Sequence, residues 1–408
     1  MRTVLFLLLL ALPAQAGIYE TSVPPKEGEK YKSADFKIWV PDDVKFIRGI
    51  VIKQHGCGRN GYDHAEDLQW QALAKKHDCA LLGSWFQPMK ECSDWFDPKN
   101  GSERALLDAL KTLAEKSRHP EIADAPWAVW GHSGGALWAM HLTFRHPERM
   151  IAAIPRSQAV VGDEAKAAQV PMLITYGERE KTGRFEKVHT NSQEAFAKFR
   201  PQGALWSIAI DPKAEHDCRN TRQISIPFFD ACLAQRLPKA KGSLLPMDTK
   251  KAWLGNPETF DVAPAAEYKG DATKANWLPD EATAKKWQEF VKTGSVEDKT
   301  PPVAPTDVVA KAGAEGVALT WQAQPDAESG IKLFHIYRDG VKIASVGGAK
   351  TKGNPMGFYQ IANYGDEPEP KPGSMTHNDK EGKPGSKYVV GIENFAGLET
   401  KSTESIAK

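Results

Sequence analysis

The fold is decided by the stretch Trp127-Ala128-Val129-Trp130-Gly131-His132-Ser133-Gly134-Gly135. Its first four residues form a short apolar run that is typical of a buried strand, and residues 136–146, which Pro147 closes, have a helical pattern. The segment between them reads Gly-x-Ser-x-Gly, which predicts a sharp strand-to-helix turn with a serine at its apex. Glycine on each side of Ser133 permits this turn, which lifts the hydroxyl over the edge of a sheet.

Strands and helices alternate on both sides of this turn. Short β-rich runs predict strands, and amphipathic spacing predicts the helices between them. The predicted strands are residues 37–40, 49–52, 79–82, 127–130, 150–154, 170–176 and 205–210. The predicted helices are residues 67–77, 102–116, 136–146, 193–199 and 226–237. This alternation predicts an α/β fold over residues 17–238, with a doubly wound, mainly parallel sheet that helices cover on both faces.

Residues 239–300 have a different composition. They are polar and interrupted by proline and glycine, but they carry Trp253, Trp277 and Trp287. One helix is predicted over residues 279–292 and begins near Asp280. The tryptophans predict an extension that packs on the α/β body. The proline-rich residues 298–305 are the predicted linker to the C-terminal part of the chain.

Residues 301–408 have an all-β pattern. Strands are predicted at residues 317–321, 334–338 and 388–392, and Asp339-Gly340 predicts a hairpin turn. Leu319-Thr320-Trp321, the hairpin and the late strand with Tyr388 resemble a fibronectin type III domain. The resemblance implies a two-sheet sandwich with Trp321 in its core. Residues 353–385 are longer and richer in loops than that family usually allows.

A base and an acid are predicted to follow Ser133 along the chain. A serine hydroxyl becomes a nucleophile when a base removes its proton, and the base needs an acid that fixes its tautomer. His216 stands in the loop after the strand at residues 205–210, and the loop after the last strand is where the histidine base is expected. The acid is expected after the strand at residues 170–176. Glu180 is the predicted acid, and Glu178 is the alternative.

Two backbone amides are predicted to stabilise an oxyanion beside Ser133. The Gly134 amide opens the helix after the serine, so the N-terminus of that helix directs it at the developing charge. The segment Gln54-His55-Gly56-Cys57-Gly58 follows an early strand, and the Cys57 amide is the predicted second donor. The two glycine motifs, the acid and the histidine occur in the order of α/β-hydrolases and predict a serine hydrolase.

The motifs resemble those of secreted polyhydroxybutyrate depolymerases and of the related feruloyl and acetylxylan esterases. The resemblance covers about residues 47–237 and is carried by His55-Gly56-Cys57, Cys92-Ser93-Asp94-Trp95-Phe96 and Gly131-His132-Ser133-Gly134-Gly135. The family's Cys-Trp-x-Trp-Phe element is present here as Cys-x-x-Trp-Phe. The resemblance implies an extracellular carboxylic ester hydrolase that acts through an acyl-enzyme on polysaccharide-linked feruloyl or acetyl esters, or on a polyester. It also implies Cys57–Cys92 and Cys218–Cys232 disulfides, with Cys79 free.

The N-terminus predicts export. Arg2, the apolar residues 4–12 and Ala14-Gln15-Ala16 have the order of a signal peptide that is cleaved after residue 16. The resulting secreted or periplasmic location is compatible with disulfides among the five cysteines. No later apolar stretch is long enough to span a bilayer, so no membrane insertion is expected after cleavage.

The composition argues against several other classes of function. The 408 residues have a formal net charge of +1 and no basic runs, so the charge pattern does not predict nucleic-acid binding. No CxxC pair occurs, and neither a metal nor a cofactor is expected. The expected partner is an ester substrate, monomeric or polymeric. Two alternatives to an esterase stay open: a secreted serine peptidase with the same triad, and a non-catalytic polymer-binding protein on a retired hydrolase fold.

Overall fold

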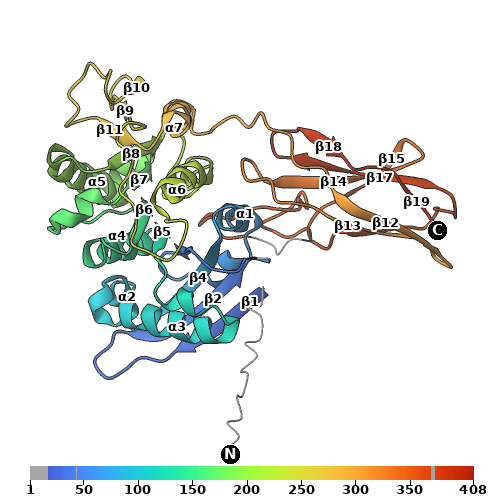
Figure 1. Cartoon of the computed structure of the whole chain (residues 1–408), viewed down its shortest axis with the longest axis horizontal. Coiled ribbons are helices and arrows are strands. Elements are labelled where there is room, and N and C mark those ends of the chain that lie inside the picture. The colour runs from blue at the N-terminus through green and yellow to red at the C-terminus, as the bar shows by residue number, and fades with distance from the viewer. Residues whose placement is uncertain (1–16, 43, 369–372) are drawn as a thin grey trace, which may run out of the picture.

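The structure, a computed structural model, describes residues 17–42, 44–368 and 373–408. The predicted signal peptide, residues 1–16, lies outside the described residues. A mixed α/β body and a C-terminal all-β unit lie side by side (Figure 1). Within the described ranges, no helix has the length and apolar character needed to cross a membrane.

The α/β body is built on an eight-stranded sheet. Its strands are β1 (Gly17–Val23), β2 (Tyr31–Val40), β3 (Gly49–Gln54), β4 (Cys79–Pro88), β5 (Trp127–His132), β6 (Met150–Arg156), β7 (Met172–Gly177) and β8 (Trp206–Asp211). Their order is β1-β2-β4-β3-β5-β6-β7-β8, with β1 and β2 antiparallel to their neighbours and all other pairs parallel. The predicted mainly parallel sheet is therefore confirmed, and β1 is an edge strand that the sequence pattern did not indicate.

Helices cover both faces of this sheet (Figure 1). They are α1 (Leu68–Lys76), α2 (Ser93–Phe96), α3 (Ser102–Ser117), α4 (Gly134–Arg145), α5 (Glu186–Phe199) and α6 (Arg222–Arg236). Successive residues of a strand point to opposite faces, so Val51 joins the core under α1 and α6, whereas Ile50 and Ile52 join the core under α3 and α4. Burial on both faces explains why these strands are continuous apolar runs. Helix α6 begins at Arg222 rather than at Ile226.

Residues 239–300 extend the core of the α/β body. They form β9 (Trp253–Gly255), β10 (Val262–Pro264), β11 (Asn276–Leu278) and α7 (Glu281–Thr293). Asp280 caps α7 by accepting a hydrogen bond from the Thr283 N–H at 2.8 Å. Trp277 and Trp287 are buried in the same apolar cluster as α6, and Trp287 Nε1 donates to the Ile208 carbonyl of β8 at 2.8 Å. The tryptophans therefore attach the extension to the edge strand β8.

The described part of the C-terminal unit consists of two antiparallel sheets (Figure 1). Its strands are β12 (Thr306–Gly313), β13 (Gly316–Gln322), β14 (Ile331–Arg338), β15 (Val341–Val346), β16 (Thr376–Asp379), β17 (Lys387–Asn394), β18 (Glu399–Lys401) and β19 (Ser405–Ile406). One sheet has the order β12-β13-β16 and the other β15-β14-β17-β18, with β19 beside β17. Trp321 and Tyr388 lie in the core that the strands enclose. Asp339 and Gly340, both with positive φ, form the predicted turn between β14 and β15.

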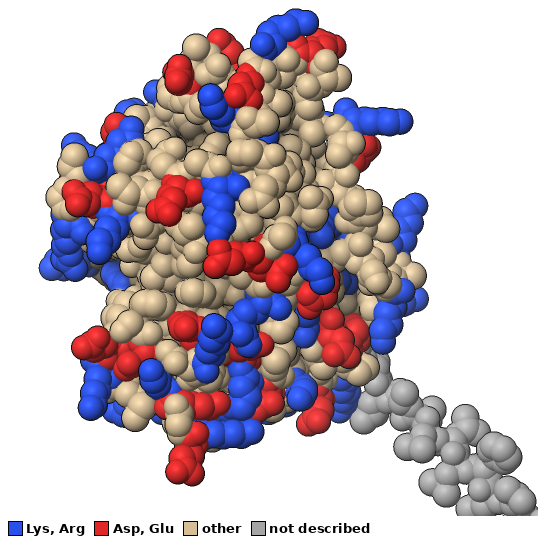
Figure 2. All heavy atoms as spheres, turned by 90° about the vertical axis from the view of Figure 1, so that its left-hand side faces the viewer, with Lys and Arg blue, Asp and Glu red and all other residues tan. Residues whose placement is uncertain are grey.

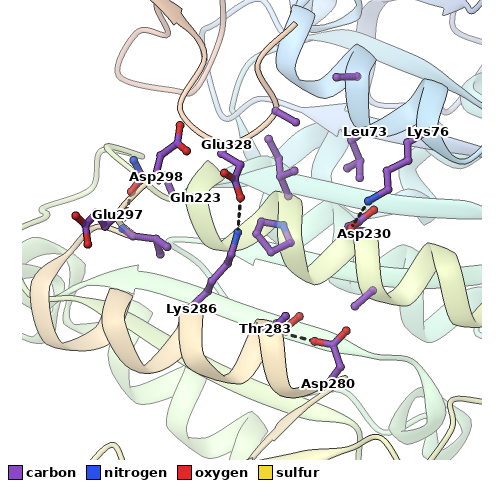
Figure 3. Close-up of a pocket in the computed structure, with 17 residues that line it drawn as sticks. Leu73, Lys76, Gln223, Asp230, Asp280, Thr283, Lys286, Glu297, Asp298 and Glu328 are labelled. Carbon is purple, nitrogen blue, oxygen red and sulfur yellow. Dashed lines mark hydrogen bonds and ion pairs between the residues drawn. The ribbon is translucent and has the colours of Figure 1, made fainter. Parts of the chain in front are cut away.

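The two bodies meet beside α1, α6 and α7. Gln69 Nε2 of α1 donates to the carbonyls of Ala327 and Glu328 at 3.3 and 3.1 Å. Lys286 of α7 forms an ion pair with Glu328 at 3.0 Å, which closes one side of a cavity of about 220 Å³ (Figure 3). Neither Ser133 nor His216 lines this cavity, so it is separate from the site described below.

Charged side chains of both signs are intermixed on the face of the molecule that points away from the C-terminal unit (Figure 2). Among the described residues drawn on that face, no large area carries a single sign.

Candidate active site

Ser133 stands at the turn between β5 and α4. Its φ is 56° and its ψ is −118°, a strained conformation for a residue with a side chain. Its N–H donates to the Arg156 carbonyl of β6 at 2.8 Å. The glycines are required by close approach, because a β-carbon at Gly131 would collide with the Gly135 carbonyl and one at Gly135 with the Gln54 carbonyl. The predicted nucleophile turn is therefore held by close backbone contacts, both within the turn and with the neighbouring strands β3 and β6.

Three predicted side chains meet at this edge of the sheet. Ser133 Oγ lies 2.9 Å from His216 Nε2, and His216 Nδ1 lies 2.6 Å from Glu180 Oε1. An ionised carboxylate only accepts hydrogen bonds, so Nδ1 carries the ring proton and Nε2 accepts from the serine hydroxyl. Glu180 is 1% exposed and His216 is 9% exposed. The arrangement is a serine–histidine–carboxylate chain that can remove the proton of Ser133.

The two carboxylates after β7 have different environments. Glu180 Oε2 accepts hydrogen bonds from the Gly177 N–H and the Ser157 hydroxyl, both at 2.8 Å, which leaves Oε1 for His216. Glu178 is exposed and forms an ion pair with Lys181 at 2.9 Å. The structure brings Glu180, and not Glu178, to the histidine.

The loop after β3 lies against the serine. A β-carbon at Gly56 would lie 2.7 Å from Ser133 Cβ, and one at Gly134 would lie 3.2 Å from Cys57 Sγ. Cys57 and Gly134 are therefore neighbours next to Ser133, where the oxyanion donors were predicted. The Cys57–Cys92 disulfide that the resemblance implied is present, with Cα atoms 5.3 Å apart, and it ties this loop to the start of α2.

The Cys218–Cys232 disulfide that the resemblance also implied is not formed, and this prediction was wrong. All three remaining cysteines, including Cys79, are buried free thiols. Cys218 precedes α6, whereas Cys232 lies far along it. At a rise of about 1.5 Å per residue, Cys232 is about 15 Å beyond Arg222, while a disulfide needs Cα atoms within about 7 Å. Burial raises the pKa of each thiol above its ordinary value.

Several side chains of the site had not been predicted. Phe185 stacks on His216, with ring centroids 4.0 Å apart and planes 5° apart. Ser157 has a φ of 61° and donates to Glu180. Its position directly after β6 could have indicated it, because the carboxyl ends of neighbouring parallel strands meet at one edge. Phe185 ends a short 3-10 helix, Gly183–Phe185, which is too short for a periodic signal to distinguish it.

Another unpredicted side chain comes from the C-terminal unit. Tyr364 lies between β15 and β16, and its ring centroid is 6.5 Å from that of His216. Its carbonyl accepts a hydrogen bond from the Cys218 N–H at 2.9 Å. Tyr364 is one wall of an open cavity of about 630 Å³ beside the catalytic edge. The other residues of this cavity are Arg179, Glu180, Phe185, Lys213, Glu215, His216, Asp217 and Arg219.

Buried histidines lie beneath the site. The His55 ring centroid is 6.3 Å from that of His64 and 5.3 Å from that of His132. Burial lowers the pKa of His55 to about 4 and the pKa values of His64 and His132 well below their ordinary value. These rings are therefore uncharged at neutral pH. Among the described residues, no group of three or more His, Cys, Asp or Glu side chains is arranged to hold a metal ion.

No protein-family model matches the chain, and no curated protein matches it in sequence. Among solved structures, the poly(3-hydroxybutyrate) depolymerase LpqC of Bordetella parapertussis is 18% identical with a TM-score of 0.38, over 55% of this chain and 92% of that one. An S-formylglutathione hydrolase of Agrobacterium tumefaciens is 14% identical with a TM-score of 0.39, over 55% and 95%. A thermostable esterase is 16% identical with a TM-score of 0.37, over 47% and 54%. These similarities are too weak to assign a function.

Proposed function

We propose that this chain is a secreted serine carboxylic ester hydrolase with an α/β-hydrolase fold. The observation that carries the proposal is the hydrogen-bonded chain from Ser133 through His216 to Glu180 at a strand-to-helix turn. Serine, acid and histidine follow one another in the order of α/β-hydrolases. The position of Cys57 and Gly134 beside the serine supports the same assignment, because an acyl-transfer reaction needs amide donors there.

In the proposed reaction, His216 Nε2 accepts the proton of Ser133 as Oγ attacks the ester carbonyl carbon. The amides of Cys57 and Gly134 donate hydrogen bonds to the resulting oxyanion. Glu180 stays ionised, orients the ring and stabilises the imidazolium. His216 then donates the proton to the alcohol oxygen, the carbon–oxygen bond breaks, and the acyl group stays on Ser133. Water activated by His216 hydrolyses this acyl-enzyme and restores the serine.

The proposed substrates are polysaccharide-linked feruloyl or acetyl esters, or a polyester of the polyhydroxybutyrate kind. This choice is supported by the resemblance of the His55-Gly56-Cys57 and Cys92 motifs and by the disulfide that joins them. Residues 1–16 are proposed to direct export, and a disulfide is compatible with an oxidising compartment. The mature chain would then comprise a catalytic domain at residues 17–238, the extension at 239–300 and a fibronectin type III domain at 301–408, for which the two-sheet core around Trp321 is the support.

The proposal is tested by labelling the purified protein with a fluorophosphonate and measuring p-nitrophenyl acetate turnover. The wild type should label and turn over the ester, and Ser133→Ala should abolish labelling and lower kcat by about 10⁶-fold. Ser225→Ala, which removes another buried serine from α6, is the matched control and should behave as the wild type. Labelling that persists in Ser133→Ala would refute the assignment of the nucleophile. Casein cleavage without ester turnover would favour a peptidase, and an inert wild type would favour a binding protein.

A further inference from the structure

The segment from Tyr359 to Glu367 starts in the C-terminal unit and reaches the interior of the α/β body. Tyr359 is buried in the core of the C-terminal unit, where its ring centroid is 4.8 Å from that of Phe334. Asp366 is 1% exposed, and its side chain is surrounded by residues of the α/β body. The segment therefore has one anchor in each body.

The anchor in the α/β body is a buried ion-pair network. Asp366 Oδ2 lies 2.6 Å from Lys53 Nζ, and Oδ1 lies 2.6 Å from Arg222 Nε. Trp70 Nε1 also donates to Oδ2 at 3.1 Å. Burial alone would raise the pKa of Asp366, but the charges of Arg222 and Lys53 hold it below its ordinary value. Lys53 is completely buried and donates hydrogen bonds to both the carboxylate and the carbonyl of Asp366. Because a buried cation is costly without a paired anion, the α/β body depends on this loop for the partner of Lys53.

The backbone of the loop fits the α/β body closely. A β-carbon at Gly365 would collide with His55 Nε2, so only glycine fits there. Asp366 has a φ of 64°, and the Tyr364 carbonyl accepts from the Cys218 N–H. The backbone of Tyr364 is therefore held by the hydrogen bond of its own carbonyl and by the two buried residues that come after it.

Tyr364 lies on the histidine side of the nucleophile. The cavity that it lines includes His216, whereas Ser133, Cys57 and Gly134 are not among its lining residues, so it lies on the side of the histidine away from the amides. During acyl transfer the carbonyl oxygen points at the amides, and the histidine protonates the leaving oxygen. The alcohol portion of an ester would therefore extend into the cavity beside Tyr364.

We propose that the C-terminal unit completes the active site and that Tyr364 is a specificity-determining residue, which binds the alcohol portion of the ester. This inference rests on the proposed ester hydrolase function and extends it to a substrate class. The aromatic rings of Tyr364 and Phe185 flank the space beside His216. They favour an alcohol that carries a flat or ring-shaped group, such as a sugar or an arene, over a small alcohol such as methanol.

The inference is tested on the full chain with acetate esters that differ only in their alcohol: methyl acetate, benzyl acetate and an acetylated xylo-oligosaccharide. Tyr364→Ala should lower kcat/KM for benzyl acetate about tenfold, mainly through KM, and should lower kcat/KM for methyl acetate much less. Tyr364→Phe keeps the ring and should restore the wild-type value. Tyr337→Ala is the matched control, because Tyr337 lies on β14 and contacts Glu399 rather than the site.

The outcomes distinguish a failure of the role of Tyr364 from a failure of the ester hydrolase function. An equal loss on methyl and benzyl acetate, or no loss on either, would overturn the role of Tyr364. A change that follows the acyl group, measured with p-nitrophenyl acetate against p-nitrophenyl butyrate, would place Tyr364 on the acyl side and overturn its assignment to the alcohol. A wild type that neither turns over esters nor labels with a fluorophosphonate would refute the ester hydrolase function itself and the inference with it.

Discussion

Ser133 and Asp366 both have positive φ although they are not glycine, and they are held in different ways. Ser133 has a φ of 56° and is held by backbone contacts, because its N–H donates to the Arg156 carbonyl and the glycines beside it allow the close approach of neighbouring backbone. Asp366 has a φ of 64° and is held by the ion pairs of its side chain with Lys53 and Arg222. A strained backbone needs surroundings that hold it, and these can be backbone contacts or buried charge.

The two positions also differ in what their side chains are free to do. Among the residues that the structure describes, the hydroxyl of Ser133 is hydrogen-bonded to His216, and it stays available to attack a substrate. The carboxylate of Asp366 accepts from three side chains and is buried, so a substrate cannot reach it. Changes around Ser133 should therefore affect mainly catalysis, whereas changes around Asp366 should affect mainly stability.

Among the changes that leave Ser133 itself in place, the largest effect is expected at Glu180, the proposed acid. Glu180→Gln keeps the shape of the side chain but removes the charge that fixes the His216 tautomer, so kcat should fall by about 10⁴-fold. Glu178→Gln is the control and should keep wild-type kcat, because Glu178 pairs with Lys181 at the surface. The measurement is p-nitrophenyl acetate turnover, with thermal unfolding to check that both variants fold. Loss of activity in Glu178→Gln alone would reverse the assignment of the acid.

The second prediction concerns Asp366, where the expected effect is on stability. Asp366→Ala leaves the buried charges of Lys53 and Arg222 without their carboxylate, so the free energy of unfolding should fall by about 3–5 kcal/mol. Adding Lys53→Met to this variant removes one of the unpaired charges and should recover part of the loss. Asp163→Ala, which breaks an exposed ion pair with Lys198, should change stability little. Urea unfolding measures all three, and an Asp366→Ala protein as stable as the wild type would show that the loop does not anchor the C-terminal unit.

The smallest effect is expected in the pH dependence of stability, through the buried histidines His55, His64 and His132. The folded-state pKa of His55, about 4, lies below the unfolded value of about 6.5, so the unfolded chain binds the proton first. Stability is therefore complete above about pH 6.5 and is lost as the pH falls towards 4. The pKa values of His64 and His132 are lowered in the same direction. Each histidine should contribute about 1.4 kcal/mol per pH unit to this slope.

His64→Phe isolates one of these contributions. Both ring nitrogens of His64 lack a hydrogen-bond partner among the described residues, so phenylalanine should fit the site without leaving a polar group unpaired. Urea unfolding between pH 5 and pH 6 gives the free energy of unfolding as a function of pH. For the variant this dependence should be less steep by the contribution of one histidine, about 1.4 kcal/mol per pH unit. At pH 8 His64 is neutral in both states, so the difference between the variant and the wild type there reports packing alone. An unchanged slope would mean that His64 is not a neutral buried residue.

Much of the catalytic body could be predicted because its signals are local. The glycines around Ser133, the apolar strands and the alternation with helices all depend on neighbours within a few residues. The order of acid and histidine then placed Glu180 and His216, because the carboxyl ends of parallel strands meet at one edge of the sheet. The sequence left Glu178 open as an alternative to Glu180. The structure distinguishes the two, because Glu180 is buried and accepts hydrogen bonds from Gly177 and Ser157.

The sequence by itself determined the sharp turn at Ser133, the mainly parallel sheet and the chain order of the proposed triad residues. Only the tertiary structure decided that Cys218 and Cys232 do not pair, because helix α6 carries them apart. Only the tertiary structure, too, brought Tyr364 to His216 and Asp366 to Lys53. No periodic pattern in the sequence indicates either contact. Each joins two segments that are far apart in the chain, and the partner of a buried charge is fixed by how those segments fit together in three dimensions.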